Sequence, residues 1–479
     1  MIRRLIFPLV LAVLAIGLFL QSNAADEDAN RPSLVASEPT PPRLSTPLLS
    51  ARRLPEHLQT PEANRRLVTS LNENIDLLPE QSCFVVSEGG EIRYDHRPES
   101  QLIPASTEKL ITAVAALNEL GRDYRFTTKI LVQNAPSEGV IDGNVWLVGG
   151  GDPLVMTSDY AQRYLDNLAY TDLEILADQI IDAGVTTITG AVVGDESYFD
   201  EIRWVESWPE RFRAGAQNQT GPLSALSVND GFVNWDTENT ANSLNTPAAE
   251  PAQFAAALFD DLLEARSVRI FQSAYAETKP VDAVIQLGVI ESPTISEIVK
   301  QMLQTSDNTT AEILVKAISA ASGVSGSTSS GNQIIQQVVE NLTGKTGSTI
   351  VSDGSGLDPG NRTTCSVLVD LLEIESFSAD LYDGLAVAGE SGTLRNRLTG
   401  SSAEGRLLAK TGTLNDSKSL AGVVHTLEDR TLIFALISNA DPMPSEIMDL
   451  HDQFVLDLVA YPTGPPISLL IPFPVVVTN

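Results

Sequence analysis

Apolar and polar positions recur along the chain in patterns that predict an α+β protein. A largely apolar run at 106–120 has the spacing of a buried helix, and Gly121 follows it as a helix-ending residue. Helical spacing returns at 295–303 and 310–321, on either side of a short polar turn. Three consecutive apolar segments predict an antiparallel sheet, at 407–414, 419–427 and 432–438.

Further elements are expected around these segments. Residues 83–86 and 88–92 predict two strands that flank a glycine turn, and ordered structure is expected from about Leu67. The Gly/Ser-rich residues 323–331 predict a loop, and residues 455–460 a closing helix.

The middle of the chain differs from both ends. Two short apolar segments, 143–149 and 189–195, each lie between glycines, and residues 173–183 between them have helical spacing. This order predicts a strand–helix–strand unit. We therefore interpret residues 127–290 as a large inserted α/β region.

The N-terminal residues predict export. Arg3 and Arg4 precede an apolar run at 5–20, and small residues follow up to Ala24. The run is shorter than the roughly 20 residues of a membrane-spanning helix. We interpret residues 1–24 as a signal peptide cleaved after Ala24, and an uncleaved anchor that associates with the membrane is the alternative.

These patterns divide the rest of the chain into further parts. Residues 25–58 are rich in proline, serine and acidic residues, which is typical of an extended linker. Residues 59–126 and 291–462 are expected to form one catalytic domain around the inserted region. Residues 463–479 are expected to be an irregular tail.

Charge, cysteine and histidine content narrow the functional classes. The formal net charge of −31 repels phosphate backbones, so nucleic acid is not an expected partner. Cys83 and Cys365 are free to form a disulfide in an exported protein, although two buried unpaired cysteines are slightly favoured. The histidines lack the spacing of a zinc-protease helix but leave open a triad of distant residues: His57, His96, His425 and His451.

Ser106 and Lys109 form a first polar cluster at the start of the expected helix. A spacing of three residues puts both on one face, and the unpaired amides of a helix start stabilise an oxyanion. An ordinary helix cap at Ser106 is the alternative, but Lys109 stands where a capping box has Glu or Gln. A lysine on an apolar helix is costly unless it is used.

Ser306 and Asn308 form a second cluster, in the turn between two expected helices. Ser306 is placed to relay a proton and Asn308 to hold a substrate amide. Helix capping is the competing interpretation, since Ser, Asp and Asn are the usual cap residues.

A third cluster lies within an apolar strand and consists of Lys410, Thr411, Gly412 and Thr413. Strand alternation puts Lys410 and Gly412 on one face, and Gly412 is expected to leave the strand bare for a substrate backbone. A second Lys-Thr-Gly at 345–347 follows a helix and a turn, so we reject it as part of the site.

Ser-x-x-Lys, Ser-x-Asn and Lys-Thr-Gly in this order match the signature set of penicillin-binding proteins and serine β-lactamases. The chain resembles the class C low-molecular-mass penicillin-binding proteins, the D-alanyl-D-alanine carboxypeptidase/endopeptidase family, over about residues 65–445. The 200 residues from Ser106 to Ser306 suit the large insertion of this family and argue against a class A β-lactamase. Further segments carry the resemblance: 103–109, 149–153, 353–357, 392–394 and 409–414.

The resemblance implies a penicillin-binding/β-lactamase-like transpeptidase fold, with an antiparallel sheet flanked by helices. It implies that Ser106 attacks the penultimate D-alanine of a peptidoglycan stem peptide and forms an acyl ester that water hydrolyses. Lys109 is the expected base, its pKa lowered by burial and by Lys410, and Ser306 returns the proton to the leaving amine. No metal or organic cofactor is expected.

The resemblance also assigns substrate contacts. Asn308 is expected to hold the acyl-side amide, and the amides of Ser106 and Thr413 to form an oxyanion hole. The terminal carboxylate is expected at Lys410, Thr411 and Thr413, although alternation points the Thr413 hydroxyl away from Lys410.

Other functions use the same motifs. A DD-endopeptidase would cut crosslinks with identical residues, a β-lactamase would differ by fast deacylation, and a non-catalytic wall-binding module would not acylate. β-Lactam antibiotics are expected as covalent inhibitors trapped as the same ester.

Overall fold

The computed structural model describes residues 11–21, 56–163, 168–213, 218–235 and 245–462. Residues 11–21 form a helix with exposed side chains, and from Thr60 onward the described residues belong to one compact unit. Within the described residues, no helix is both long and apolar enough to cross a membrane. The cleavage site after Ala24, nearly all of the expected linker and the expected tail lie outside the described residues.

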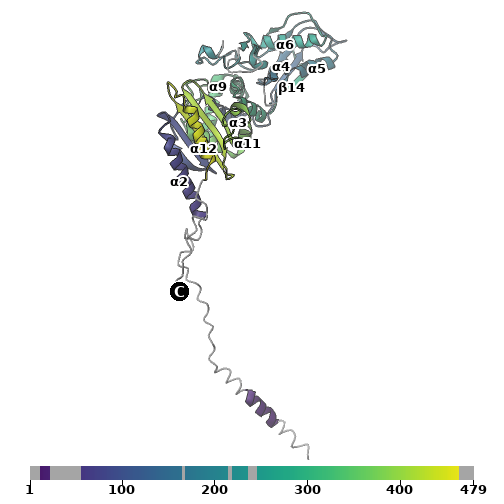
Figure 1. Ribbon diagram of the computed structural model, residues 1–479. Helices are drawn as coiled ribbons and strands as arrows, with labels where there is room; N and C mark the ends of the chain where they lie inside the picture. The colour runs from purple at the N-terminus through teal and green to yellow at the C-terminus, as the bar shows by residue number, and fades with distance from the viewer. Residues whose placement is uncertain (1–10, 22–55, 164–167, 214–217, 236–244, 463–479) are drawn as a thin grey trace, which may run out of the picture. The chain divides into compact units, whose positions relative to one another are not determined.

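The compact unit contains a six-stranded antiparallel sheet (Figure 1). Three neighbouring strands are the C-terminal strands that the sequence predicts, and the two strands around the glycine turn extend the sheet. In order across the sheet the strands are β15 (Ala386–Val387), β16 (Leu407–Thr413), β17 (Ser417–His425), β18 (Thr431–Asn439), β1 (Gln81–Glu88) and β2 (Glu91–His96).

Alternation along these strands creates two separate apolar layers. In β1, Phe84 and Val86 pack with α2 (Glu56–Ile75) and α12 (Ile447–Val459) on one face. Cys83 and Val85 point to the other face, which a larger group of helices covers. These helices are α3 (Glu108–Glu119), α7 (Ile295–Thr305), α8 (Asn308–Ala321), α9 (Thr328–Thr343), α10 (Cys365–Glu373) and α11 (Glu375–Gly384).

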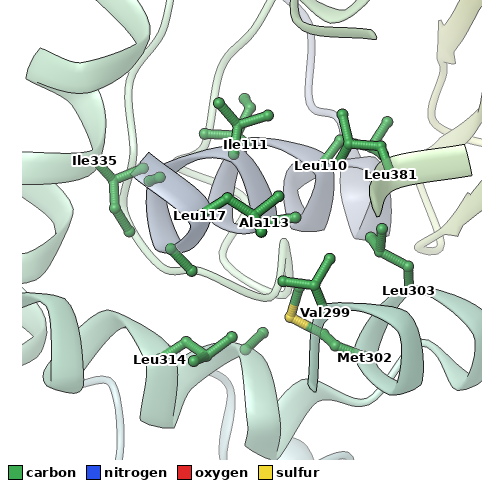
Figure 2. Packing of buried hydrophobic residues seen from close by; sticks show 14 of the residues in the cluster. Leu110, Ile111, Ala113, Leu117, Val299, Met302, Leu303, Leu314, Ile335 and Leu381 are labelled. Atoms are coloured by element: carbon green, nitrogen blue, oxygen red, sulfur yellow. The ribbon is translucent and has the colours of Figure 1, made fainter. Parts of the chain in front are cut away.

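Helix α3 is the centre of the larger layer, as its apolar sequence predicts. Its residues from Glu108 to Leu117 are all buried, and side chains of α7, α8, α9 and α11 surround it (Figure 2). A helix enclosed on every side offers one rigid support for any polar group that it carries.

A disulfide joins Cys83 of β1 to Cys365 at the start of α10. The slightly favoured expectation of two unpaired cysteines is therefore wrong. The two residues are 282 positions apart in sequence, and only the packing of α10 on the sheet brings them together.

The inserted region contains a second, mixed sheet. Its strands β5 and β9 are parallel neighbours with α5 (Glu174–Asp182) between them in sequence, which confirms the predicted strand–helix–strand unit. The order is β13 (Tyr275–Ala276), β9 (Val192–Asp195), β5 (Val145–Val148), β3 (Thr127–Val132) and β14 (Ile285–Glu291). The chain enters by β3 and leaves by the adjacent β14, whereas a separate domain bounded at 127 and 290 stays a prediction.

Short elements complete this region and connect it to the catalytic helices. Met156, Tyr160 and Phe232 belong to the same apolar core as α3. The elements are β4 (Val140–Ile141), β6 (Val155–Met156), α4 (Ser158–Ala161), β7 (Thr171–Asp172), β8 (Thr187–Ile188), η3 (Glu210–Phe212), η4 (Asn229–Gly231), β10 (Phe232–Asn234), β11 (Thr246–Pro247), α6 (Pro251–Ala265) and β12 (Arg269–Ile270).

Three helices begin earlier than the sequence pattern predicts. Helix α2 starts well before Leu67, α12 starts at Ile447 rather than 455, and α9 starts inside the expected loop 323–331. In α9 the Ser327 hydroxyl accepts a hydrogen bond from the Ser330 amide, so a serine-rich run that looked like a loop is a helix start.

Candidate active site

Ser106 lies in a 3₁₀ turn, η2 (Ala105–Thr107), that leads into α3. Ala105 has a φ of 49°, and its carbonyl lies so close to Gly356 that a Cβ there would be 1.9 Å away. The residues that precede the two helical segments, Pro104 and Thr107, make no side-chain cap, and the Ser106 hydroxyl bonds to Lys109 instead. The helix-cap interpretation of Ser106 is therefore wrong.

Lys109 is fully buried, one turn after Ser106. Its Nζ donates to Ser106 Oγ at 3.2 Å, to Asn308 Oδ1 at 2.6 Å and to the Ser355 carbonyl at 2.7 Å. Three acceptors therefore fix the amine beside the serine hydroxyl, and the expected pairing of these two residues on one helix face is confirmed.

In the turn between α7 and α8, one residue caps the following helix and its two neighbours contact the buried lysines. Asp307 is the N-cap of α8, because its carboxylate accepts from the Thr310 amide at 3.0 Å. Ser306 has a left-handed backbone, with a φ of 63°, and its hydroxyl accepts from Lys410 Nζ at 2.9 Å. Asn308 contacts Lys109 and donates from Nδ2 to the Gln219 carbonyl at 2.9 Å.

Strand β16 brings the third cluster to the same place. Lys410 is fully buried and donates to Ser306 Oγ and to the Thr411 carbonyl, at 2.9 and 2.8 Å. Thr411 donates from its hydroxyl to Thr393 Oγ1 at 2.9 Å. Among the described residues, β15 pairs with β16 only at Leu408 and Ala409, so the outer edge of β16 from Lys410 onward has no strand partner.

Gly412 does not leave a bare surface for substrate, so that expectation is wrong. A Cβ at Gly412 would lie 2.0 Å from Ser419 Oγ, 2.7 Å from the Pro104 carbonyl and 3.1 Å from the Ser106 amide nitrogen. Glycine is needed here because β16 packs directly against the turn that carries Ser106.

Burial controls the charge of both lysines. It lowers the pKa of Lys109 to about 8, although nearby carboxyl groups, first Asp353 and then Glu312, oppose the shift. Burial, followed by the charge of Lys109, lowers the pKa of Lys410 well below its usual range. The expected lowering of the Lys109 pKa by burial agrees with this direction, whereas the lysine–lysine repulsion contributes to the lowered pKa of Lys410.

Three buried carboxyl groups lie behind the lysine pair. Burial raises the pKa of Glu312 to about 8, that of Glu108 well above its usual range, and that of Asp353 as well. Both carboxyl oxygens of Glu108 have no hydrogen-bond partner in the described part of the chain. Burial without hydrogen-bond partners therefore disfavours the charged carboxylate of Glu108.

The clusters open into one cleft of about 1110 Å³. Ser106, Ser306, Asn308, Thr411 and Thr413 line it, while Lys109 and Lys410 are fully buried. Both threonines line the cleft, so Thr413 reaches the site although alternation points its hydroxyl away from Lys410. Other wall residues that the sequence pattern did not single out are Arg211, Phe212, Gln219, Leu357, Arg397 and Lys418.

The second Lys-Thr-Gly, which was excluded from the site on sequence grounds, lies outside the cleft. Lys345 forms ion pairs with Asp370 at 2.6 Å and Glu99 at 3.7 Å, and 345–347 do not line the cleft. No histidine lines the cleft among the described side chains, and His451 is buried against Ser438 at 3.0 Å. A histidine-based triad has no support in this geometry.

The site also contains residues that motif reasoning missed. The Ser355 carbonyl, Glu312 and Asp353 surround Lys109, yet none was given a role. One signal was present, because Glu312 is a charged residue on an apolar helix, the same feature that singled out Lys109. In the sequence, the segment 353–357 carries only a likeness to the family and no motif that gives it a role.

The amino-acid sequence matches the D-Ala-D-Ala carboxypeptidase 3 (S13) family over residues 77–249 and 237–458. The chain belongs to this family. It is thus a serine peptidase of D-alanyl-D-alanine bonds and a class C low-molecular-mass penicillin-binding protein, which confirms the resemblance in the motifs.

Individual relatives agree with this assignment. A D-alanyl-D-alanine carboxypeptidase of Actinomadura sp. is 28% identical over 501 residues, which cover 87% of this chain and 90% of the relative. A carboxypeptidase of Mycobacterium tuberculosis is 30% identical over 373 residues, with 75% and 76% covered. Penicillin binding protein 4 of Haemophilus influenzae has a TM-score of 0.67 at 20% identity, with 81% of this chain and 98% of that chain covered, which confirms the fold class.

Proposed function

We propose that this peptidase is an exported D-alanyl-D-alanine carboxypeptidase in which Ser106 is the nucleophile and Lys109 the base. The observation that carries the proposal is the buried Lys109 amine, 3.2 Å from the Ser106 hydroxyl and with its pKa lowered to about 8. An amine that is partly neutral near pH 8 can accept the serine proton, which an ordinary lysine cannot do efficiently.

Ser306 completes the proton path. Its hydroxyl accepts from Lys410 Nζ at 2.9 Å and lines the cleft, so it can donate its own proton to the leaving amine. Lys410, whose pKa burial lowers well below its usual range, then acts as a hydrogen-bonding partner of Ser306 rather than as the main cation for the substrate carboxylate.

The substrate carboxylate is assigned to the hydroxyls of Thr411 and Thr413, beside the Lys418 ammonium. Lys418 pairs opposite Thr413 across the sheet and lines the same cleft. The free edge of β16 would pair with the peptide backbone of the stem. The Ser106 amide faces β16 closely enough to form an oxyanion hole together with the Thr413 amide.

Asn308 has a double task in this proposal. Its Oδ1 accepts a hydrogen bond from Lys109. Its Nδ2 donates to the Gln219 carbonyl in the structure and would exchange this partner for the acyl-side carbonyl of the stem peptide. Gln219 belongs to the inserted region, which therefore borders the acyl side of the cleft.

DD-endopeptidase activity is the second candidate. It needs the same nucleophile and base but a leaving group that continues as a second peptide. Two solved structures of predatory endopeptidases from Bdellovibrio bacteriovorus share the fold, with TM-scores of 0.54 and 0.52. Release of free D-alanine and of crosslinked dimers from one substrate mixture distinguishes the two activities.

Export of the chain is part of the proposal. The N-terminal run has the composition of a secretory signal, and the Cys83–Cys365 disulfide requires an oxidising compartment to form and persist. N-terminal sequencing of the mature protein distinguishes a cleaved signal from a membrane anchor.

Labelled penicillin tests the central assignment. The wild-type protein is expected to form a covalent adduct, mapped by mass spectrometry to Ser106, and to release D-alanine from a stem peptide. Ser106→Ala is expected to lose both reactions. An adduct on a different residue, or D-alanine release by Ser106→Ala, would overturn the assignment.

A further inference from the structure

The loop 353–361 supplies the backbone carbonyl that holds the proposed base. Lys109 Nζ donates to the carbonyl of Ser355 at 2.7 Å, deep in the protein. The amide of the same peptide group belongs to Gly356, and it donates to Asp353 Oδ1 at 2.8 Å. One rigid peptide unit therefore connects the Asp353 carboxyl group to the Lys109 amine.

The Asp353 carboxyl group is fully buried and accepts hydrogen bonds from four donors. Its Oδ1 accepts from the Gly356 amide and from Asn361 Nδ2 at 2.7 Å. Its Oδ2 accepts from the Asp358 amide and from Trp208 Nε1, both at 2.7 Å. Three of these donors belong to the loop itself, and only Trp208 comes from outside.

Trp208 is a residue of the inserted region and is 3% exposed. Its ring packs in an apolar cluster with Val205, Phe212 and Leu357, of which the last two also line the cleft. The neighbouring Ser207 donates to the Asp358 carboxylate, so the inserted region forms hydrogen bonds with two acidic residues of the loop.

Helix α8 fixes the other side of the loop. Glu312 Oε1 accepts from the amides of Gly354 and Ser355, at 3.0 and 2.8 Å. The loop is thus held from α8 and from the inserted region at once, and α3 donates to its carbonyls from Lys109 and from Thr112, the latter to Gly354 at 2.7 Å.

We propose that Asp353 and Trp208 are positioning residues for the reaction: Asp353 fixes the Ser355–Gly356 peptide group that holds Lys109, and Trp208 makes the inserted region part of this support. The inference rests on the proposed role of Lys109 as the base. It gives the inserted region a task within the chemistry, in addition to forming a cleft wall.

The same contacts bear on the charge of Lys109. The groups that face it are Glu108 on its own helix, Glu312 on α8, Asp307 in the turn before α8, Asp353 in the loop and Lys410 on β16. Asp353 raises the pKa of Lys109, and the Trp208 hydrogen bond lowers the pKa of Asp353. Loss of that bond favours protonated Asp353, which lowers the pKa of Lys109.

Trp208→Phe tests the inference in the full chain, because it keeps an aromatic ring and removes only the N–H donor. Acylation of Ser106 by labelled penicillin is measured as a single-turnover rate from pH 6 to pH 10. The plateau rate is expected to fall by about tenfold, because a loosened loop misplaces the base, and the acid limb is expected to move to lower pH. Substrate affinity should change less than the acylation rate.

Trp204→Phe is the matched control. Trp204 packs against the same apolar cluster, but no hydrogen bond joins it to Asp353, so its rate and pH profile should match the wild type. Equal losses in the two variants, or a wild-type profile for Trp208→Phe with Ser106 still labelled, would overturn the inference alone. A wild-type protein with no label on Ser106 would instead defeat the proposed function.

Asp353→Asn provides a second, independent measurement. The side-chain carbonyl can still accept from Gly356, but the charge is lost, so the acid limb should again move to lower pH. Thermal unfolding of each variant shows whether it folds. A folded Asp353→Asn protein with an unshifted acid limb contradicts the electrostatic part of the inference.

Discussion

The chain contains the tripeptide Lys-Thr-Gly twice, and the two copies have different surroundings. In 410–412 the lysine is fully buried, bonds to Ser306 and has no carboxylate partner among its hydrogen bonds. In 345–347 the lysine is partly exposed and paired with Asp370, and the glycine ends a turn with a φ of 74°. The comparison teaches that the chemistry comes from burial beside a second lysine, and not from the tripeptide.

Removal of the lysine amine should give the largest difference in acylation rate between the two Lys-Thr-Gly copies. Lys410→Ala is expected to lower the rate of Ser106 acylation by about 10³-fold, because Ser306 loses its proton partner. Lys345→Ala is expected to keep the wild-type rate and to cost at most about 1 kcal/mol of unfolding free energy, since it removes a partly exposed ion pair. Stopped-flow acylation and urea unfolding measure both. Comparable rate losses in the two variants would break the comparison.

Substitution of the two glycines should give the second largest difference in stability and acylation rate between the copies. Gly412→Ala places a methyl group against Ser419, the Pro104 carbonyl and the Ser106 amide, so about 2 kcal/mol of stability and about 10²-fold in acylation rate should be lost. Gly347→Ala meets no atom within 4 Å, and its positive φ should cost only about 1 kcal/mol. A Gly412→Ala protein with normal acylation would show that β16 does not need to approach Ser106 so closely.

The pH dependence of acylation gives the smallest but most specific effect. Because the proposed base must be neutral and its pKa is lowered to about 8, the rate should rise about tenfold per pH unit below 8 and level off above it. Lys345→Ala should give the same curve. A rate that keeps rising to the pKa of an ordinary lysine, near 10.5, would mean that Lys109 is not the base.

Regular elements make two of the three motifs recognisable in the sequence, whereas Ser306 lies in a turn between two helices. A helix spacing relates Ser106 to Lys109, and an apolar strand singles out Lys410. Their convergence on one cleft could be expected only through the resemblance to a known family, because pattern alone carries no distance between 106, 306 and 410.

The residues that support the motifs could not be predicted in this way. Trp208 and Asp353 are 145 positions apart, and neither belongs to a periodic pattern that would relate them. The crowding of Gly412 depends on how closely β16 packs on η2, and the Cys83–Cys365 bond on how α10 sits on the sheet. Such contacts follow from tertiary packing, which local sequence patterns do not encode.

The inserted region shares an apolar core with the helices around α3, and this limits which segments can be removed by engineering. Tyr160, Phe199 and Phe232 fill space against the catalytic helices, although they are distant from every motif. A truncated antibiotic biosensor made by excising residues 127–290 and rejoining the ends would open this interior to water. A smaller sensor is better sought by redesigning the outer strands of that segment, which leaves the buried aromatic side chains in place.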